Sequence, residues 1–323
     1  MSVVHFGAIR SDLQPGESAL DGLLRNGASL AYACKAGTCG SCMVRAVSGP
    51  VPARAQVGLK DSWKARGYFL PCVCHPEGDL VAEAAGSDAR VGAAIRSLKL
   101  LSADVLRVRL VCDTPLDFHA GQYLTVVRER SLARSYSIAS LPGDVGENPE
   151  VELHIRRVAN GRMSGWLFGN AGPGDRVEVQ GPSGECFYVA GRQHMPMLLV
   201  GTGTGLAPLY AIARDALRSG HRAPVHLVHG ATRPAGLYLR DELLATARSH
   251  ANFQYTASVL EGGGDGCVTG PLEGLLATRF PNLEGWRGYV CGDPGLVKSL
   301  RMKLFLAGIG MPDLYSDSFL PSA

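Results

Sequence analysis

Cysteine is the residue type whose spacing in this chain carries the clearest chemistry. Cys34, Cys39 and Cys42 stand in the spacing C-x4-C-x2-C within a glycine-rich stretch. Thiolates in this spacing, together with one more distant cysteine, form the arrangement that holds a [2Fe–2S] cluster. Gly37 and Gly40 lack side chains, which allows the backbone to fold closely around such a cluster. The sequence therefore predicts a [2Fe–2S] cluster with these three cysteines among its ligands.

The fourth ligand is one of two cysteines further along the chain. Cys72 follows Cys42 after 29 intervening residues and Cys74 follows it after 31. We favour Cys72, because residues 70–76 then resemble the Leu-x-Cys-x-x-x-Pro ending of plant-type ferredoxins, and Cys74 stays open. A zinc site or a group of buried thiols is the alternative for the whole set, and the glycine-rich loop argues against it. The remaining cysteines are expected to be small buried hydrophobes: Cys112, Cys186 and Cys267.

A second pattern follows the fully apolar segment 195–200, where a glycine-rich turn leads into a predicted helix over 209–219. A strand, such a turn and a helix place backbone N–H groups where a dinucleotide pyrophosphate binds. The spacing differs from G-x-G-x-x-G and resembles the Gly-x-Gly-x-Ala-Pro turn of the ferredoxin–NADP reductase family. The residues predicted to contact the nucleotide are Gly203, Thr204, Gly205, Ala207 and Pro208.

Residues 134–137 resemble the Arg-x-Tyr-Ser flavin motif of the same family. Arg134 offers a forked cation for the pyrophosphate of FAD, and Tyr136 offers a flat ring for the isoalloxazine. Ser137 offers a hydroxyl near flavin N5, where the hydride arrives, so we assign it a catalytic role. Ser135 completes the motif. Taken alone, the motif is also compatible with an ordinary half-buried strand.

A second flavin signal comes about 27 residues later. In the family, a strand followed by a Gly-x-x-Ser turn holds the pyrophosphate on backbone N–H groups at a helix start. The residues predicted to bind the cofactor here are His154, Ile155, Arg156, Gly161, Arg162, Met163 and Ser164. Together with Arg134 these residues form a pyrophosphate site, which favours FAD over FMN.

Hydrophobic periodicity divides the chain into three predicted domains. Residues 1–90 combine strands, a helix over 18–27 capped by Ser18, and the cysteine loop, which indicates a β-grasp ferredoxin domain. Residues 91–190 contain many short alternating strands, which indicates a closed antiparallel β-barrel, and the resemblance of its motifs to the ferredoxin–NADP reductase family implies six strands and FAD. Residues 191–323 alternate strands and helices, which predicts a doubly wound parallel α/β domain for NAD(P)H. A short linker is expected over 84–92.

Composition excludes several other classes of protein. Hydrophobic residues make up 46% of the chain and charged residues 19%, which is ordinary for a globular protein. The net charge of +3 is too small to indicate a nucleic-acid partner. No apolar run reaches the roughly 18 residues of a membrane span. We therefore expect a cytoplasmic monomer that binds neither nucleic acid nor membrane.

The order ferredoxin, flavin barrel and nucleotide domain strongly resembles the reductase components of multicomponent bacterial oxygenases. The resemblance implies that electrons pass from NAD(P)H through FAD to the [2Fe–2S] cluster. It also implies that Cys291, in the family's Cys-Gly-x-Pro pattern, lies beside the nicotinamide and is catalytic. The remaining cofactor-binding residues that it implies are Gly292, Asp293 and Pro294. Residues 314–320 resemble the family's terminal acid-x-Phe pattern, which places Phe319 near the flavin, and an ordinary packing aromatic is the alternative.

The nucleotide preference stays open at this stage. Arg233 follows the second predicted strand of the nucleotide domain, where the ribose 2′ position is recognised. An arginine there could bind the 2′-phosphate of NADPH. We expect NADH to serve as donor, with NADPH as a possible second.

The electron acceptor implied by the resemblance is an oxygenase component or its ferredoxin, within a system that oxygenates aromatic compounds or hydrocarbons. Two alternatives remain. The cysteine loop and residues 134–139 also resemble the reductase that serves CDP-deoxysugar (CDP-6-deoxy-glucoseen) deoxygenation. A redox carrier or sensor without turnover would need the iron–sulfur part alone.

Overall fold

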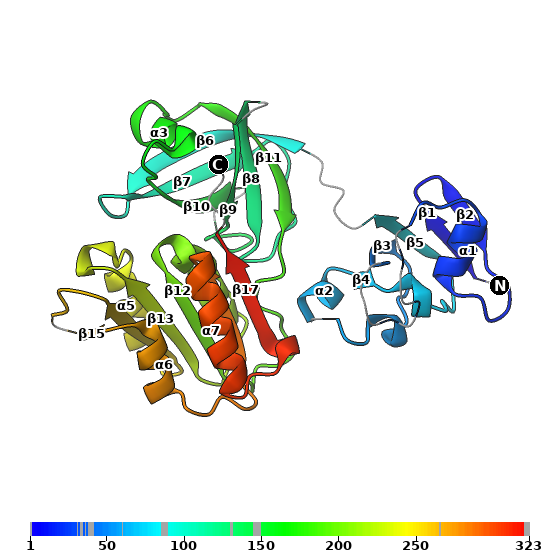
Figure 1. Cartoon of the computed structure of the whole chain (residues 1–323). Helices are drawn as coiled ribbons and strands as arrows, with labels where there is room; N and C mark the ends of the chain where they lie inside the picture. The colour runs from blue at the N-terminus through cyan, green and yellow to red at the C-terminus, as the bar shows by residue number, and fades with distance from the viewer. Residues whose placement is uncertain are drawn as a thin grey trace. The chain divides into compact units, whose positions relative to one another are not determined.

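The computed structural model describes residues 2–30, 32, 35, 37, 42–59, 61–84, 90–129, 132–144, 150–264 and 266–319. The chain divides into two compact units, Met1–Ser87 and Asp88–Ala323, each with its own hydrophobic core (Figure 1). The expected linker over 84–92 is too long, because strand β5 includes Ala84 and strand β6 begins at Arg90.

The first unit is built on a five-stranded mixed sheet with the strand order β2-β1-β5-β3-β4. The strands are β1 (Val3–Phe6), β2 (Ile9–Asp12), β3 (Val44–Ser48), β4 (Tyr68–Phe69) and β5 (Leu80–Ala84). Strand β1 pairs antiparallel with β2 and parallel with β5, so the first and last strands lie side by side. This is the predicted β-grasp fold.

Helix α1 (Ala19–Arg25) packs across this sheet and helps to position the second cysteine segment. The Ser18 hydroxyl accepts a hydrogen bond from the Asp21 N–H at 3.1 Å, which confirms the predicted cap. The Ala19 N–H donates to the Cys74 carbonyl oxygen at 2.8 Å. The start of α1 is therefore tied to the segment that follows the short helix η2 (Pro71–Val73). The first unit also contains η1 (Ala53–Gln56) and α2 (Asp61–Ala65).

The second unit begins with the predicted six-stranded antiparallel barrel, in the order β10-β7-β6-β11-β8-β9. Its strands are β6 (Arg90–Leu100), β7 (Val105–Cys112), β8 (Tyr123–Glu129), β9 (Leu132–Ser137), β10 (Glu150–Arg156) and β11 (Arg176–Ser183). A bridge between Ile138 and Leu153 joins the end of β9 to β10 and closes the sheet. Helix α3 (Arg162–Gly169) follows β10.

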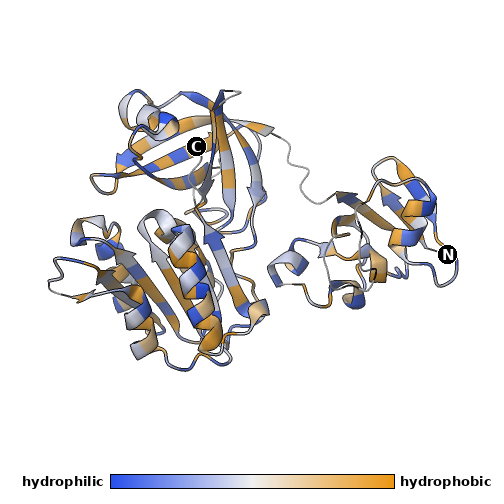
Figure 2. Cartoon of the chain, viewed as in Figure 1, coloured by the Kyte–Doolittle hydropathy of each residue, from blue (hydrophilic) through white to orange (hydrophobic). Residues whose placement is uncertain are grey.

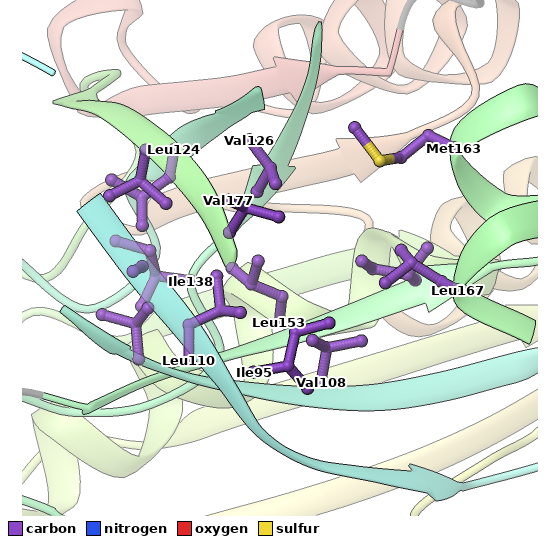
Figure 3. Close-up of a cluster of buried hydrophobic side chains, with 14 of the residues drawn as sticks. Ile95, Val108, Leu110, Leu124, Val126, Ile138, Leu153, Met163, Leu167 and Val177 are labelled. Atoms are coloured by element: carbon purple, nitrogen blue, oxygen red, sulfur yellow. The ribbon is translucent and has the colours of Figure 1, made fainter. Parts of the chain in front are cut away.

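The barrel interior is filled by aliphatic side chains from every strand. Ile95, Leu110 and Leu153 are each at most 2% exposed, and they lie together with Leu124 and Val177 in the barrel interior (Figure 3). Because inward and outward residues alternate along each strand, the outer faces remain available for polar side chains.

The rest of the second unit is a parallel sheet in the order β15-β14-β13-β12-β16-β17. Its strands are β12 (Met197–Thr202), β13 (Val225–Ala231), β14 (Phe253–Val259), β15 (Cys267–Thr269), β16 (Arg287–Gly292) and β17 (Leu314–Ser318). One face is covered by α4 (Leu206–Arg218) and α5 (Arg240–Ser249), and the other by α6 (Leu272–Arg279) and α7 (Pro294–Leu306). This confirms the doubly wound prediction.

The hydropathy of the strands explains why some of them could be predicted from the sequence and others could not. The central strands carry hydrophobic stretches, whereas α6 and α7 mix hydrophobic and hydrophilic residues (Figure 2). The edge strands β15 and β17 were not predicted, because β15 has three residues and β17 is mostly polar. Since β17 pairs with β16, it brings the C-terminal segment to the carboxyl edge of the sheet.

Candidate functional site

In the first unit, two of the predicted cluster ligands meet. Cys42 lies just before β3 and Cys72 lies within η2, and their side chains share a hydrogen bond inside one apolar cluster. Burial, with a contribution from that hydrogen bond, raises the pKa of the Cys42 thiol to about 11. Cys34 and Cys39 lie outside the described residues. Within the described ranges, no group of three or more His, Cys, Asp or Glu side chains could hold a metal ion.

The backbone around this pair fits a cluster loop. Lys35 and Gly37 both have positive φ angles, 51° and 76°, so the loop turns sharply at the described positions. A Cβ atom at Gly37 would come within 3.1 Å of the Val73 side chain, so the loop passes close to the residue after Cys72. The Lys35 ammonium pairs with Asp21 of α1 at 2.7 Å. Lys35 therefore lies against α1, and Gly37 lies against the residue that follows Cys72.

Cys74 has a different environment from Cys72. Its side chain is fully buried in the other apolar cluster of this unit, among Val4, Leu23 and Phe69. Burial alone raises the pKa of the Cys74 thiol to about 12. The side chain that shares a hydrogen bond with Cys42 is that of Cys72. The choice of Cys72 as the fourth ligand remains a prediction, and this geometry favours it.

In the barrel, the predicted flavin residues occupy β9. Arg134 and Tyr136 are half-buried. Ser135 is exposed, and its hydroxyl shares a hydrogen bond with that of Thr125 at 3.0 Å. Ser137 is 5% exposed at the end of the strand. Burial raises the pKa of the Tyr136 phenol. The motif is thus a half-buried strand whose last residue turns into the interior of the second unit.

The predicted pyrophosphate turn lies at the start of α3. Gly161 caps the helix without a side-chain hydrogen bond, so the first-turn N–H groups depend on another partner. A Cβ atom at Gly161 would lie 2.5 Å from the Ser164 Oγ, and only glycine fits there. Ser164 accepts from the Val158 N–H at 3.1 Å, Met163 is buried, and Arg162 pairs with Glu129 at 3.8 Å. This backbone cradle suits an anionic group.

The three predicted residues on β10 point in different directions. Ile155 lies in the barrel core and Arg156 is exposed. His154 is 3% exposed, and its ring nitrogens lie 3.0 Å from the Glu152 Oε1 and 3.3 Å from the Tyr238 hydroxyl of the parallel-sheet part. Burial lowers the pKa of His154. The His154 side chain therefore joins the barrel to the nucleotide part.

Glu152 anchors this contact electrostatically. Its carboxylate also pairs with Arg107 and Arg109, each at 3.0 Å. Burial by itself would raise the pKa of Glu152, but the hydrogen bonds from His154 and Arg109 and the nearby charge of Arg107 lower it to about 2. The two arginines keep Glu152 ionised, and they compensate for removing its charge from water.

A cavity of about 800 Å³ opens at the carboxyl edge of the parallel sheet. The predicted residues that line it are Arg156, Gly203, Thr204, Arg233, Gly292, Asp293 and Phe319. Gly205 packs directly against the Cys291 carbonyl, and Ala207 and Pro208 are buried in the first turn of α4. Asp293 caps α7 by accepting from the Leu296 N–H at 3.1 Å, with Pro294 as the first helical residue. The volume of this cavity and its position at the carboxyl edge of the sheet suit a dinucleotide.

The two predicted catalytic residues are brought together by a third. The Ser137 hydroxyl donates to the Asp317 carboxylate at 3.2 Å, and Asp317 lies opposite Cys291 in the β16–β17 pairing. The Cys291 sulfur lies 3.6 Å from that of Cys186. Burial raises the pKa of Asp317 and that of Cys291, the latter with help from Cys186. This group forms the inner site: Ser137, Asp317, Cys291 and Cys186.

Asp317 and Cys186 were not among the residues chosen from the sequence. Asp317 had a signal, since residues 314–320 resemble the family's terminal acid-x-Phe pattern. Cys186 had none, because it was expected to be a small hydrophobe. It is indeed 3% exposed, but it also contacts a predicted catalytic thiol.

Three family models match successive parts of the chain. A 2Fe–2S iron–sulfur cluster binding domain matches residues 8–77, an oxidoreductase FAD-binding domain residues 93–188, and an oxidoreductase NAD-binding domain residues 199–302. The order is the one predicted from the motifs.

Curated relatives match along nearly their whole length. The ferredoxin–NAD(P)+ reductase component of the naphthalene 1,2-dioxygenase/salicylate 5-hydroxylase systems of a Ralstonia species is 34% identical, with 96% of this chain and 95% of that protein covered. The corresponding naphthalene 1,2-dioxygenase component of Pseudomonas putida is 32% identical, with 95% and 94% covered. The chain belongs to this family of oxygenase reductase components.

Solved structures agree with the assignment. A cytochrome P450 reductase from Amycolatopsis is 30% identical, with 99% of each chain covered and a TM-score of 0.69. The ferredoxin reductase of carbazole 1,9a-dioxygenase, at 24% identity and a TM-score of 0.65, shares the fold. The reductase is therefore an oxidoreductase that carries electrons from NAD(P)H through FAD to a [2Fe–2S] cluster. Within its described residues, no helix has the length and hydropathy needed to span a membrane.

Proposed function

We propose that this reductase supplies electrons to an oxygenase that acts on aromatic compounds, either directly or through a separate ferredoxin. The relatives carry the choice of acceptor, and the inner site supports the electron chain, because it joins the flavin strand β9 to strand β16 beside the dinucleotide cavity. The relatives from Ralstonia and Pseudomonas are named as parts of naphthalene dioxygenase systems, and an Amycolatopsis relative, 35% identical, as the reductase subunit of an aromatic O-demethylase.

When bound, FAD supplies the conversion between a two-electron donor and a one-electron cluster. In this proposal Arg134 and the first turn of α3 bind its pyrophosphate, with Gly161 allowing the close approach. Tyr136 would supply a flat ring for the flavin. Ser137 would offer its hydroxyl to the flavin, and the Asp317 carboxylate fixes that hydroxyl by accepting its hydrogen bond.

The cavity at the carboxyl edge of the sheet would bind NAD(P)H. Residues 203–208 form the turn for its pyrophosphate, and Arg156 adds a cation from the barrel side. Cys291 would lie beside the nicotinamide, with Gly292 and Asp293 forming the adjoining wall. Burial raises the pKa of the Cys291 thiol, and in this position the thiol would exclude water from beside the nicotinamide.

In the first unit, Cys34, Cys39, Cys42 and Cys72 would hold the iron. We assign the ferredoxin domain to residues 1–90, the flavin domain to 91–190 and the nucleotide domain to 191–323. The family matches at 8–77, 93–188 and 199–302 support this division. We further propose a cytoplasmic monomer without a nucleic-acid or membrane partner, which light scattering of the purified holoprotein would test.

The decisive test of the electron chain is an anaerobic titration of the holoprotein with NADH, followed by visible absorption and low-temperature EPR. We expect uptake of about three electrons per chain, with flavin bleaching and the rhombic signal of a reduced [2Fe–2S] cluster. Flavin bleaching without that signal would remove the assigned cluster from the chain.

The client is tested by reconstitution. We expect the reductase to support product formation by an aromatic-ring oxygenase at a rate far above that with a CDP-deoxysugar dehydratase. The reverse preference would favour the deoxysugar alternative, which the same cofactor chain allows.

A further inference from the structure

An ion pair that the sequence did not reveal lies beside the dinucleotide cavity: Arg233 and Leu260 line the wall, and Glu261, which follows Leu260, is not itself a lining residue. Arg233 follows β13 and lines the cavity. Its Nε and Nη2 both donate to the Glu261 Oε2, each at 3.2 Å. Glu261 follows β14 and lies 28 residues further along the chain. The Arg233 guanidinium, which was expected to be available to a ligand, is therefore already paired with the Glu261 carboxylate.

Backbone hydrogen bonds hold the two partners in place. The Leu260 N–H donates to the Ala231 carbonyl at 3.1 Å, and the Glu261 N–H donates to the Thr232 carbonyl at 3.0 Å. These bonds extend the contact between β13 and β14 beyond the strand ends. The position of Glu261 next to Arg233 is thus set by the sheet and does not depend on the attraction between exposed side chains.

This is the place where an adenosine ribose is recognised. In doubly wound domains the pyrophosphate lies at the first glycine-rich turn, and the ribose 2′ position lies beyond the carboxyl end of the next strand. Here the first turn is 203–205 and the next strand, β13, ends at Ala231, two residues before Arg233. An acidic residue there accepts a hydrogen bond from a 2′-hydroxyl, and an unpaired arginine there binds a 2′-phosphate.

We propose that Glu261 makes this reductase select NADH over NADPH, an inference that rests on the proposed occupancy of the cavity by a nicotinamide dinucleotide. The Oε2 of Glu261 is shared with Arg233, while among the described residues no hydrogen bond is made to Oε1. That oxygen can accept from the 2′-hydroxyl of NADH. The 2′-phosphate of NADPH would be repelled by the Glu261 carboxylate. The Arg233 guanidinium, which could attract that phosphate, is already paired with Glu261.

The Arg233–Glu261 ion pair can be removed with little loss of stability. The side chains of Arg233 and Glu261 are 74% and 61% exposed, and exposed pairs contribute little to stability. A variant at this position therefore reports on the ligand. Asp113 provides a matched control, since it forms an exposed ion pair with Arg176 of the barrel and does not line the cavity.

The experiment measures kcat/KM for NADH and NADPH with ferricyanide as acceptor, using holoprotein. We expect the wild type to prefer NADH by about tenfold or more, and Glu261→Gln to raise kcat/KM for NADPH by about tenfold. Adding Arg233→Gln to Glu261→Gln should abolish that gain, because the freed guanidinium is what binds the phosphate. Asp113→Asn should leave both values unchanged.

Two results would overturn the inference while leaving the proposed function intact. One is a wild type that prefers NADPH. The other is a Glu261→Gln variant with the same ratio of NADH to NADPH efficiency as the wild type. If neither nucleotide reduced the flavin of intact holoprotein, the proposed function would fail, and this inference would fail with it.

Discussion

Among the described residues, two pairs of buried thiols have different neighbours. Cys42 and Cys72 meet in the first unit, inside one apolar cluster. Cys186 and Cys291 meet in the second unit, 3.6 Å apart, next to the half-buried carboxyl group of Asp317. In the proposed assignment, the surrounding groups, more than the thiol contact, distinguish the pair that would bind iron from the pair that would border a nucleotide.

The largest effect expected is the loss of the cluster from Cys72→Ser, because a hydroxyl is a poor ligand for iron compared with a thiolate. Iron content and the EPR signal of the reduced protein measure it. Reduction of cytochrome c should disappear, while reduction of ferricyanide at the flavin should persist. Cys74→Ser should keep its iron; if it lost iron and Cys72→Ser did not, the assignment of the two cysteines would be reversed.

The second-largest effect concerns the thiol pair of the second unit, Cys186 and Cys291. Cys291→Ala should lower the rate of flavin reduction by NADH by about 10- to 100-fold, because a cavity beside the nicotinamide loosens the reacting geometry. Stopped-flow absorption measures this rate. Iron content serves as the control and should be unchanged. An unchanged rate would remove the catalytic role from Cys291.

A smaller effect is expected for its partner. A weak S–H hydrogen bond contributes about 0.5–1 kcal/mol, so Cys186→Ala should slow the same step by about two- to fivefold. Cys186→Ser, which restores a donor, should recover part of the rate. Equal rates for the alanine and serine variants would show that Cys186 acts through packing alone.

Cys74, which lies in the same unit as Cys42 and Cys72, allows a test through the free energy of unfolding. Cys74→Ser places a hydroxyl in an apolar cluster, and an unpaired buried hydroxyl costs about 1–3 kcal/mol in the free energy of unfolding. Thermal unfolding of the first unit, followed by its cluster absorption, measures the loss. Cys74→Ala keeps the site apolar and should be milder. A serine variant as stable as the wild type would mean that the hydroxyl finds a partner.

The smallest effect is a dependence on pH from Asp317. Its pKa is higher in the folded protein than its ordinary value of 3.8, mainly through burial. The stability that it contributes is therefore complete below the unfolded pKa and falls as the pH rises through the folded pKa. Asp317→Asn should remove this decline in unfolding curves measured across the acidic range. An identical pH profile in the variant would exclude the buried charge as its source.

Much of the fold followed from the sequence because its signals are local. The cap at Ser18, the apolar run of β12 and the glycine turn after it each depend on neighbouring residues. Since parallel strands end at one edge of a sheet, the turn at Gly203 and the Cys291 motif, each predicted separately, lie at the same edge.

The contacts that escaped prediction join distant segments. Cys186 and Cys291 are separated by 105 positions, and the outcome depends on how the end of the barrel packs against β16. The same holds for His154, whose strand was predicted but whose partner Tyr238 lies 84 positions away. Spacing within a motif carries no information about such pairs. For the same reason, the sequence left Cys72 and Cys74 open.

The dinucleotide cavity has a thermodynamic consequence. Asp104 and Arg156 of the barrel line the same cavity as Thr204 and Gly292 of the parallel sheet. A ligand that touches both parts binds only when both are folded and in contact, so its binding free energy is added to their joint unfolding. Calorimetry without the nucleotide should reveal less cooperativity between barrel and sheet than calorimetry with it. The donor of electrons would thus also act as the group that fastens the two halves of the second unit together.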